Sequence, residues 1–150
     1  MEKIIFAKPN IESFCFIVVF FEDGNLYLDE AFFAESAKEL NQKISENISE
    51  IENVRYDVSI FMQDGKNLRE LIPNTPVLCY KPKQKLKERI AAQNEWLKEN
   101  IIIDEDYNNS EYIRFIELFK GYRMDDTCNS IAVDILSDAS KYFRRIKNII

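Results

Sequence analysis

The stretch Phe14-Cys15-Phe16-Ile17-Val18-Val19-Phe20-Phe21 is the strongest indication of structure in this 150-residue chain. Its β-branched and aromatic side chains predict a strand. Because they are apolar on both faces, we expect the strand at the centre of a sheet. Asp23-Gly24 follows, a preferred pair for a tight hairpin turn. We therefore expect a return strand over 25–29 that pairs Phe21 with Leu26, Phe20 with Tyr27 and Val19 with Leu28.

Beyond this hairpin, the hydrophobic period changes along the chain. From about residue 30 the spacing of three or four predicts a helix with the stripe Phe33, Ala37, Leu40, Ile44, Ile48 and Ile51. Alternation over 54–62 predicts a second strand, and 77–80 a short third one. The remainder is predicted to be helical over about 86–101, 110–120 and 127–150, with a loop at 102–109. Ser110 is the expected N-cap of the second of these helices, and Asp126 or Thr127 that of the third.

The order of these elements predicts the fold class. Strands dominate first and helices follow, which is typical of α+β proteins. We expect a small, mostly antiparallel sheet from the N-terminal half packed with helices, and a helical C-terminal half. A length of 150 residues with 46% hydrophobic content favours a single globular domain over 1–150.

The composition and charge of the chain disfavour several classes of function. Histidine is absent, which removes the usual proton shuttle and the commonest metal ligand. Residues 1–76 hold 14 acids and 7 bases, a net of −7, and residues 77–150 hold 12 acids and 13 bases, a net of +1. An acidic N-terminal half disfavours binding to nucleic acid, because its phosphates are bound by Lys and Arg. We therefore predict no direct nucleic-acid partner.

The cysteines and the N-terminus bear on location. Cys15, Cys79 and Cys128 form no CxxC pair and have no histidine beside them, so a zinc site is improbable and a reduced, cytoplasmic setting is expected. Cys15 and Cys79 lie in apolar runs and are predicted to be core residues. The first residues do not resemble a cleaved signal, and the uncharged stretch 13–21 is too short to span a membrane.

Two acidic segments could bind a metal. Counting Asp104 as position 1 of a calcium loop places Asn109 where glycine belongs and Phe115 where a bidentate glutamate belongs, so the loop fails. Asp125-Asp126 could hold magnesium, but helix capping explains the pair. We predict no metal, no cofactor and no catalytic residues.

A basic run also has two interpretations. Lys81, Lys83, Lys85, Lys87 and Arg89 could contact nucleic acid or phosphate. A solvated helix of mixed charge is the alternative, since Glu88, Glu95 and Glu99 follow. The negative charge of the whole chain favours the second interpretation.

Acidic patches beside tyrosines suggest instead a surface for a basic protein partner. Aromatic side chains would supply binding energy, and the charges would speed association. An ordinary solvated face is the alternative for each patch. The candidate partner-binding residues are Glu35, Glu39, Glu46, Asp104, Glu105, Asp106, Tyr107 and Tyr112.

In this overall profile, the chain resembles bacterial immunity proteins of interbacterial toxin systems. The resemblance implies a non-enzymatic protein that neutralises a cognate toxin domain, such as a nuclease, by covering a basic surface. It is carried by no diagnostic motif, so it assigns no residue. Phage-encoded inhibitors of defence enzymes share the profile. A carboxylate- or metal-dependent enzyme and a structural or adaptor subunit are the alternatives, and the oligomeric state stays open.

Overall fold

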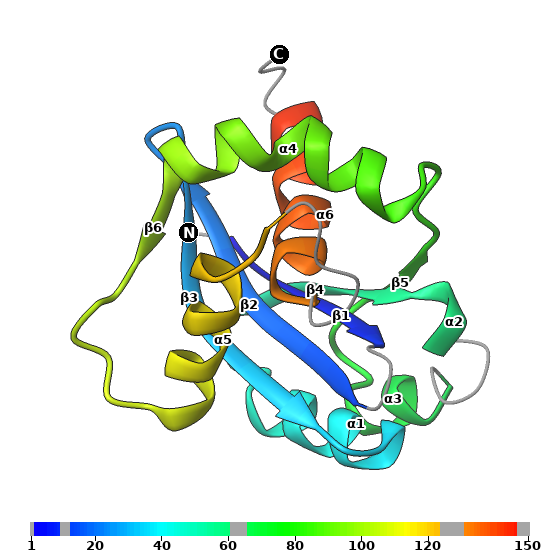
Figure 1. Ribbon diagram of the computed structural model, residues 1–150. Helices are drawn as coiled ribbons and strands as arrows, with labels where there is room; N and C mark the ends of the chain where they lie inside the picture. The colour runs from blue at the N-terminus through cyan, green and yellow to red at the C-terminus, as the bar shows by residue number, and fades with distance from the viewer. Residues whose placement is uncertain (1, 10–12, 61–65, 124–130, 147–150) are drawn as a thin grey trace.

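The computed structural model describes residues 2–9, 13–60, 66–123 and 131–146. It contains a six-stranded sheet in the order β5-β4-β1-β2-β3-β6, with helices on both faces (Figure 1). The strands are β1 (Lys3–Pro9), β2 (Phe14–Glu22), β3 (Asn25–Ala34), β4 (Ile51–Asp57), β5 (Val77–Tyr80) and β6 (Ile101–Ile103). The helices are α1 (Ala37–Glu46), α2 (Val58–Ile60), α3 (Lys66–Leu71), α4 (Leu86–Asn100), α5 (Ser110–Lys120) and α6 (Ile131–Ile146).

The β2–β3 hairpin confirms the predicted register. Phe21 lies opposite Leu26, Phe20 opposite Tyr27 and Val19 opposite Leu28. The turn holds Asp23 at a φ of 52° and Gly24 at a φ of 79°. Positive φ at both positions matches the right-handed twist of the two strands. β2 lies between β1 and β3, which explains its two apolar faces.

The α+β class is confirmed, but the sheet is mixed rather than mostly antiparallel. β1, β2 and β3 are antiparallel neighbours, whereas β4 pairs with β1, β5 with β4 and β6 with β3 in parallel. β4, β5 and β6 each follow a helix, and a helical connection returns the chain in the direction that parallel pairing needs. Three strand pairings are therefore parallel in a sheet that was expected to be mostly antiparallel.

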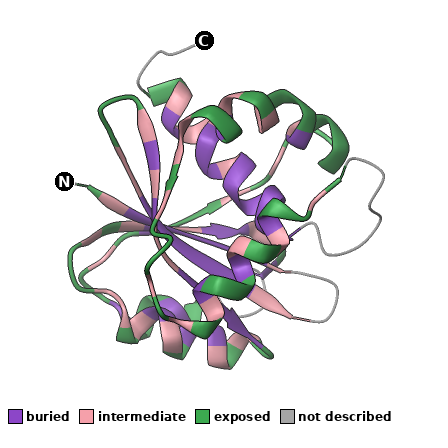
Figure 2. Ribbon diagram, turned by 60° about the vertical axis from the view of Figure 1, so that its left-hand side comes forward, coloured by how far each residue is buried: buried purple, intermediate pink, exposed green. Residues whose placement is uncertain are grey.

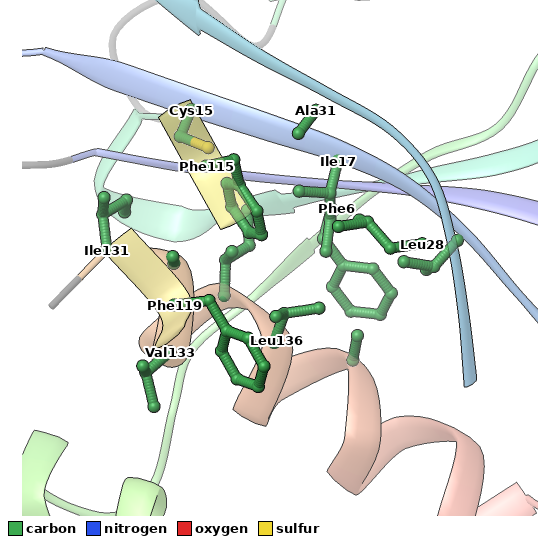
Figure 3. Packing of buried hydrophobic residues seen from close by; sticks show 14 of the residues in the cluster. Phe6, Cys15, Ile17, Leu28, Ala31, Phe115, Phe119, Ile131, Val133 and Leu136 are labelled. Atoms are coloured by element: carbon green, nitrogen blue, oxygen red, sulfur yellow. The ribbon is translucent and has the colours of Figure 1, made fainter. Parts of the chain in front are cut away.

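Each face of the sheet carries its own hydrophobic cluster. On one face, Ile4, Phe6 and Ile17 pack with residues of α4, α5 and α6. Figure 3 shows Phe115 of α5 and Leu136 of α6 in this layer. On the other face, Ile5 and Phe16 pack with residues of α1, α2 and α3. Ten of the sixteen residues of α6 are buried, so α6 is a core helix with inward positions for polar groups. Figure 2 shows the mixture of buried and exposed faces on the helices.

Several predicted boundaries are wrong near the strands. β3 continues to Ala34, so Phe33 is a strand residue. α1 begins at Ala37, after the N-cap Ser36. β4 ends at Asp57, where α2 begins. β6 occupies part of the predicted loop 102–109, because Ile101–Ile103 pairs with β3.

Smaller corrections concern caps and cysteines. Asn109, not Ser110, caps α5, since its side chain accepts hydrogen bonds from the backbone of Glu111 and Tyr112. Cys15 is buried as predicted, but Cys79 is exposed, because it lies on the edge strand β5. Met62, Asp125, Asp126, Thr127 and Cys128 lie outside the described residues. None of the described helices has the length and hydropathy to cross a membrane.

Candidate functional site

Three parallel strands bring polar side chains to one edge of the sheet. β1, β4 and β5 are adjacent and run the same way, so their carboxyl ends meet. Lys8 lies near the end of β1, Asp57 ends β4, and Tyr80 ends β5. In open sheets with helical connections, ligands bind beyond the carboxyl ends of the strands. This edge is therefore the candidate site.

α6 adds two aspartates to this edge. Asp134 and Asp138 are four residues apart, so they project from the same side of the helix. Side chains alternate along β1, and Ile4 and Phe6 face the layer that contains α6. Lys8 continues that alternation and faces the same helix. Its ammonium group thus meets aspartates that lie 126 and 130 positions later in the chain.

The Lys8 ammonium nitrogen lies among three carboxylates. Nζ is 2.6 Å from Oδ2 of Asp138, 3.0 Å from Oδ1 of Asp134 and 3.9 Å from Oδ2 of Asp57. Lys8 is 3% exposed, so these contacts replace most of its hydration. The other oxygen of Asp57 accepts hydrogen bonds from the backbone and hydroxyl of Ser59, at 2.9 and 2.6 Å. Each carboxylate is thus held in place.

Arg89 and Tyr80 complete the cluster. The Arg89 guanidinium donates to Asp134 and, at 3.1 Å, to Asp138. The Tyr80 hydroxyl donates to Oδ2 of Asp138 at 3.0 Å. Lys8 and Arg89 carry +2 against −3 on the three aspartates, which leaves −1. We call Lys8, Asp57, Tyr80, Arg89, Asp134 and Asp138 the aspartate cluster.

Burial and charge shift the ionisation of these groups. Burial raises the pKa of Asp134 above its ordinary value, although Lys8 and Arg89 favour its charged form. Burial lowers the pKa of Arg89, but Asp134 and Asp138 more than offset this, so the pKa is raised. Burial, and next the charge of Asp138, raise the pKa of Tyr80 well above its usual value. Tyr80 therefore stays a hydrogen-bond donor at neutral pH.

A basic pocket adjoins the aspartate cluster. Its volume is about 510 Å³, and Tyr80, Arg89 and Asp138 belong to both. Asp138 is its one acidic lining residue among those described. The cationic lining residues are Arg55, Lys81, Lys83, Arg89, Lys141 and Arg145.

Part of the predicted acidic surface lies around α1. Glu35 and Glu46 are at or near the surface, and Glu39 caps the start of α1 by accepting a hydrogen bond from the Glu35 backbone. That bond, more than the neighbouring Lys43, lowers the pKa of Glu39. Capping explains Glu39 without a partner.

The other predicted residues lie between β6 and α5. Asp104, Glu105 and Asp106 are exposed. Asp104 and Tyr107 line a pocket of about 270 Å³ with Asp29 and Glu30. Tyr112 is 1% exposed, because its hydroxyl donates to the Leu28 carbonyl and accepts from the Asp104 backbone. Tyr112 is therefore a core residue, while partner binding by the remaining seven stays a prediction.

Comparisons with known proteins agree on the fold. No family model matches the chain, and no curated protein is similar to it. The chain is similar to the human cytomegalovirus terminase nuclease domain soaked with Mn (TM-score 0.63, 10% identity, 92% of this chain and 81% of that one). It is also similar to the nuclease domain of the bacteriophage SPP1 large terminase with bound Mn (TM-score 0.61, 12% identity, 95% and 85%). A third is T. thermophilus RuvC in complex with Holliday junction substrate (TM-score 0.53, 12% identity, 99% and 98%).

These similarities overturn the functional predictions. The chain shares its fold with these three proteins, and this contradicts the resemblance to immunity proteins. A non-enzymatic neutraliser of a toxin is contradicted, as is the exclusion of enzymes and of nucleic acid. Net charge misled the prediction, because a few local cations decide what a pocket attracts.

The residues present do not fit the manganese that two of these structures contain. Carboxylate oxygens are suitable ligands for such an ion, and three aspartates converge here. However, the Lys8 ammonium fills the space between them, and Arg89 uses two of the same carboxylates. No group of three or more metal-ligating side chains in the described part of the chain could hold a metal ion.

Sequence reasoning missed the aspartate cluster, although weak signals existed. Lys8 interrupts the apolar alternation of Ile4 and Phe6 at an inward position. Asp134 and Asp138 lie four apart in the last predicted helix, and Asp134 interrupts the apolar run 131–136. An inward lysine and two inward aspartates each need a partner, since buried charges are paired. Ion pairing is therefore predictable from these residues, but the identity of each partner is not.

Proposed function

We propose that this protein acts on nucleic acid and that the basic pocket binds the phosphodiester backbone. One observation carries the proposal: six of the twelve residues that line the pocket are Lys or Arg, and one is acidic. Backbone phosphates are recognised by such cations, largely without regard to base sequence. The pocket also lies at the carboxyl ends of β4 and β5, where ligands bind in related architectures.

Individual contacts support an anionic ligand. The Arg55 guanidinium stacks on the Tyr142 ring, with 3.8 Å from its central carbon to the ring centroid. Its Nε is buried and has no hydrogen-bond partner among the described residues. A buried donor of this kind is costly unless a ligand accepts from it. Lys81, Lys83 and Arg145 are exposed at the same pocket and could meet neighbouring phosphates.

The nuclease fold supports the same proposal. A neighbour solved with a Holliday junction substrate shows that this fold can hold nucleic acid. A net charge of −6 does not exclude it, because the pocket concentrates cations locally. The cytoplasmic setting and the single domain over 1–150 stay predictions.

Cleavage of the bound backbone is the second candidate function. It is suggested by the nuclease neighbours, although Lys8 fills the space between Asp57, Asp134 and Asp138. Cleavage by a metal ion would require these carboxylates to release Lys8. The two candidates therefore differ in their need for divalent metal.

Fluorescence anisotropy tests binding. Labelled single-stranded DNA, duplex DNA, a four-way DNA junction and RNA are titrated with the protein in EDTA at low salt. We expect binding of at least one of these, and a loss of tenfold or more in Lys81→Glu/Lys83→Glu. Lys98→Glu/Lys120→Glu is the matched control, because it makes the same charge change at two exposed lysines that do not line the pocket. No binding by the folded wild type, or equal losses in both variants, would refute the proposal.

Incubation of the same substrates with Mg²⁺ or Mn²⁺ tests cleavage. Cleavage that disappears in Asp134→Asn would support the second candidate. Binding in EDTA without cleavage in either metal would support the first alone.

A further inference from the structure

We infer that the ammonium group of Lys8 takes the place of a divalent cation in the aspartate cluster. Nζ lies within 4 Å of carboxylate oxygens on three residues that converge from β4 and α6, which is the arrangement expected around a metal ion. The cation that these carboxylates surround belongs to the protein itself. The inference concerns this cluster only and does not depend on nucleic-acid binding.

Lys8 cannot readily leave this position. β1 holds its backbone between β2 and β4, where Lys8 pairs in register with Cys15. The residue is 3% exposed, and its side chain points toward α6. An ammonium drawn away from the three carboxylates would have to be rehydrated, while the carboxylates would remain buried without it.

Charge explains why one occupant excludes the other. A divalent ion adds +2 to the +2 of Lys8 and Arg89, which would set +4 against the −3 of three carboxylates. The ion would also have to take oxygens from Lys8, because Asp134 and Asp138 each already bind both cations. Repulsion at such short distances in a partly buried site is strong. We therefore expect the wild-type cluster to reject Mg²⁺ and Mn²⁺.

The inference predicts that one substitution creates a metal site. Lys8→Asp removes the ammonium and adds a fourth carboxylate from β1, while Asp57, Asp134 and Asp138 remain. Lys8→Met removes only the charge and keeps the length of the side chain. In both variants the carboxylates lose a cation, and a divalent ion restores it.

Thermal unfolding in EDTA and in MnCl₂ tests the inference without nucleic acid. The wild type should show no saturable rise in Tm. Lys8→Asp should show one, about 5–10 °C at an Mn²⁺ concentration 100 times the Kd, because only the folded site binds the ion. Lys8→Met should respond in the same direction. Isothermal titration with MnCl₂ should give one site in Lys8→Asp and none in the wild type.

Two variants serve as controls. Lys120→Asp makes the same charge change as Lys8→Asp, but Lys120 pairs with Glu105 at the surface and is far less buried than Lys8. The Tm of this variant should be insensitive to Mn²⁺. Lys8→Asp/Asp134→Asn should lose the gained site. One-site Mn²⁺ binding by the wild type that Asp134→Asn abolishes would overturn the inference, even if no Lys8 variant folds. A folded Lys8→Asp protein that binds no Mn²⁺ would overturn it as well. Neither result bears on binding in EDTA, which tests the proposed function separately.

Discussion

The Nζ of Lys8 and Oδ2 of Asp138 lie 2.6 Å apart, which joins the central strand β1 to the last described helix α6. Both side chains are almost fully buried. A pair of this kind contributes little relative to a matched apolar pair, but removing one partner leaves the other charge buried alone. The stability of the fold should therefore be sensitive to single substitutions here.

Replacing Lys8 by Met should destabilise the protein by about 3 kcal/mol, because three carboxylates would then share Arg89 alone. Urea unfolding measures the change. Lys8→Met/Asp138→Asn should recover part of the loss. Lys120→Met, at an exposed pair, should cost under about 1 kcal/mol. Equal losses for Lys8→Met and Lys120→Met would contradict the account of the cluster.

Binding to nucleic acid should weaken with salt, because the proposed contacts are to phosphates. Replacing one contacting cation, for example by Lys83→Ala, should reduce the slope of log K against log salt by about 0.7–0.9. The loss should be similar for unrelated sequences, since phosphate contacts carry no sequence information. Anisotropy titrations between low and moderate salt measure both effects. A loss confined to one sequence would argue for base contacts instead.

Tyr107 should titrate late. Its hydroxyl donates to both oxygens of Glu30, at 2.7 and 2.8 Å. This hydrogen bond, followed by burial, raises the pKa of Tyr107 from 10.0 to about 12. The folded state keeps this proton longer than the unfolded state, so the added stability is complete below pH 10 and is lost as pH rises to about 12.

Ultraviolet difference titration of the wild type against Tyr107→Phe measures that pKa. Glu30→Gln should move it back toward 10, since the carboxylate supplies the largest contribution. A Tyr107 that ionises near pH 10 in the wild type would show that the hydrogen bond is absent in solution.

The hairpin turn should depend on backbone conformation at Gly24. Its φ is +79°, and a Cβ added there would meet no atom within 4 Å. The cost of Gly24→Ala is therefore conformational and should be about 1 kcal/mol. Gly24→Asn should cost less, because Asn tolerates positive φ better than Ala. Urea unfolding of both variants measures the two costs, and equal costs would contradict positive φ at this position as their cause.

Local patterns predicted the elements whose contacts are local. The pairing of Phe20 with Tyr27 followed from a turn two residues long, and α5 ends at Lys120, where the predicted helix 110–120 ends. Ile101–Ile103 was missed as a strand because three apolar residues between polar neighbours carry no period. Its strand character comes from pairing with β3, which lies more than 70 positions earlier.

The site was harder to predict than the fold. Lys8, Asp57, Arg89 and Asp138 lie in four separate segments, and parallel pairing of β1 with β4 is what brings two of them together. The mostly antiparallel sheet that we expected would have placed those strand ends at opposite edges. The basic run 81–89 was visible in the sequence, but the total charge argued against it, and its position beside Arg55 and Arg145 needed the folded chain.

The link between β1 and α6 also bears on how the protein is made. Lys8 leaves the ribosome 126 positions before Asp134, and Arg89 leaves 45 positions before it. Until α6 has been made, both cations lack Asp134 and Asp138, which contact them in the finished fold. Docking of α6 then removes water from five charged side chains at once. A nascent chain from which α6 has not yet emerged thus has the strands but not the complete aspartate cluster.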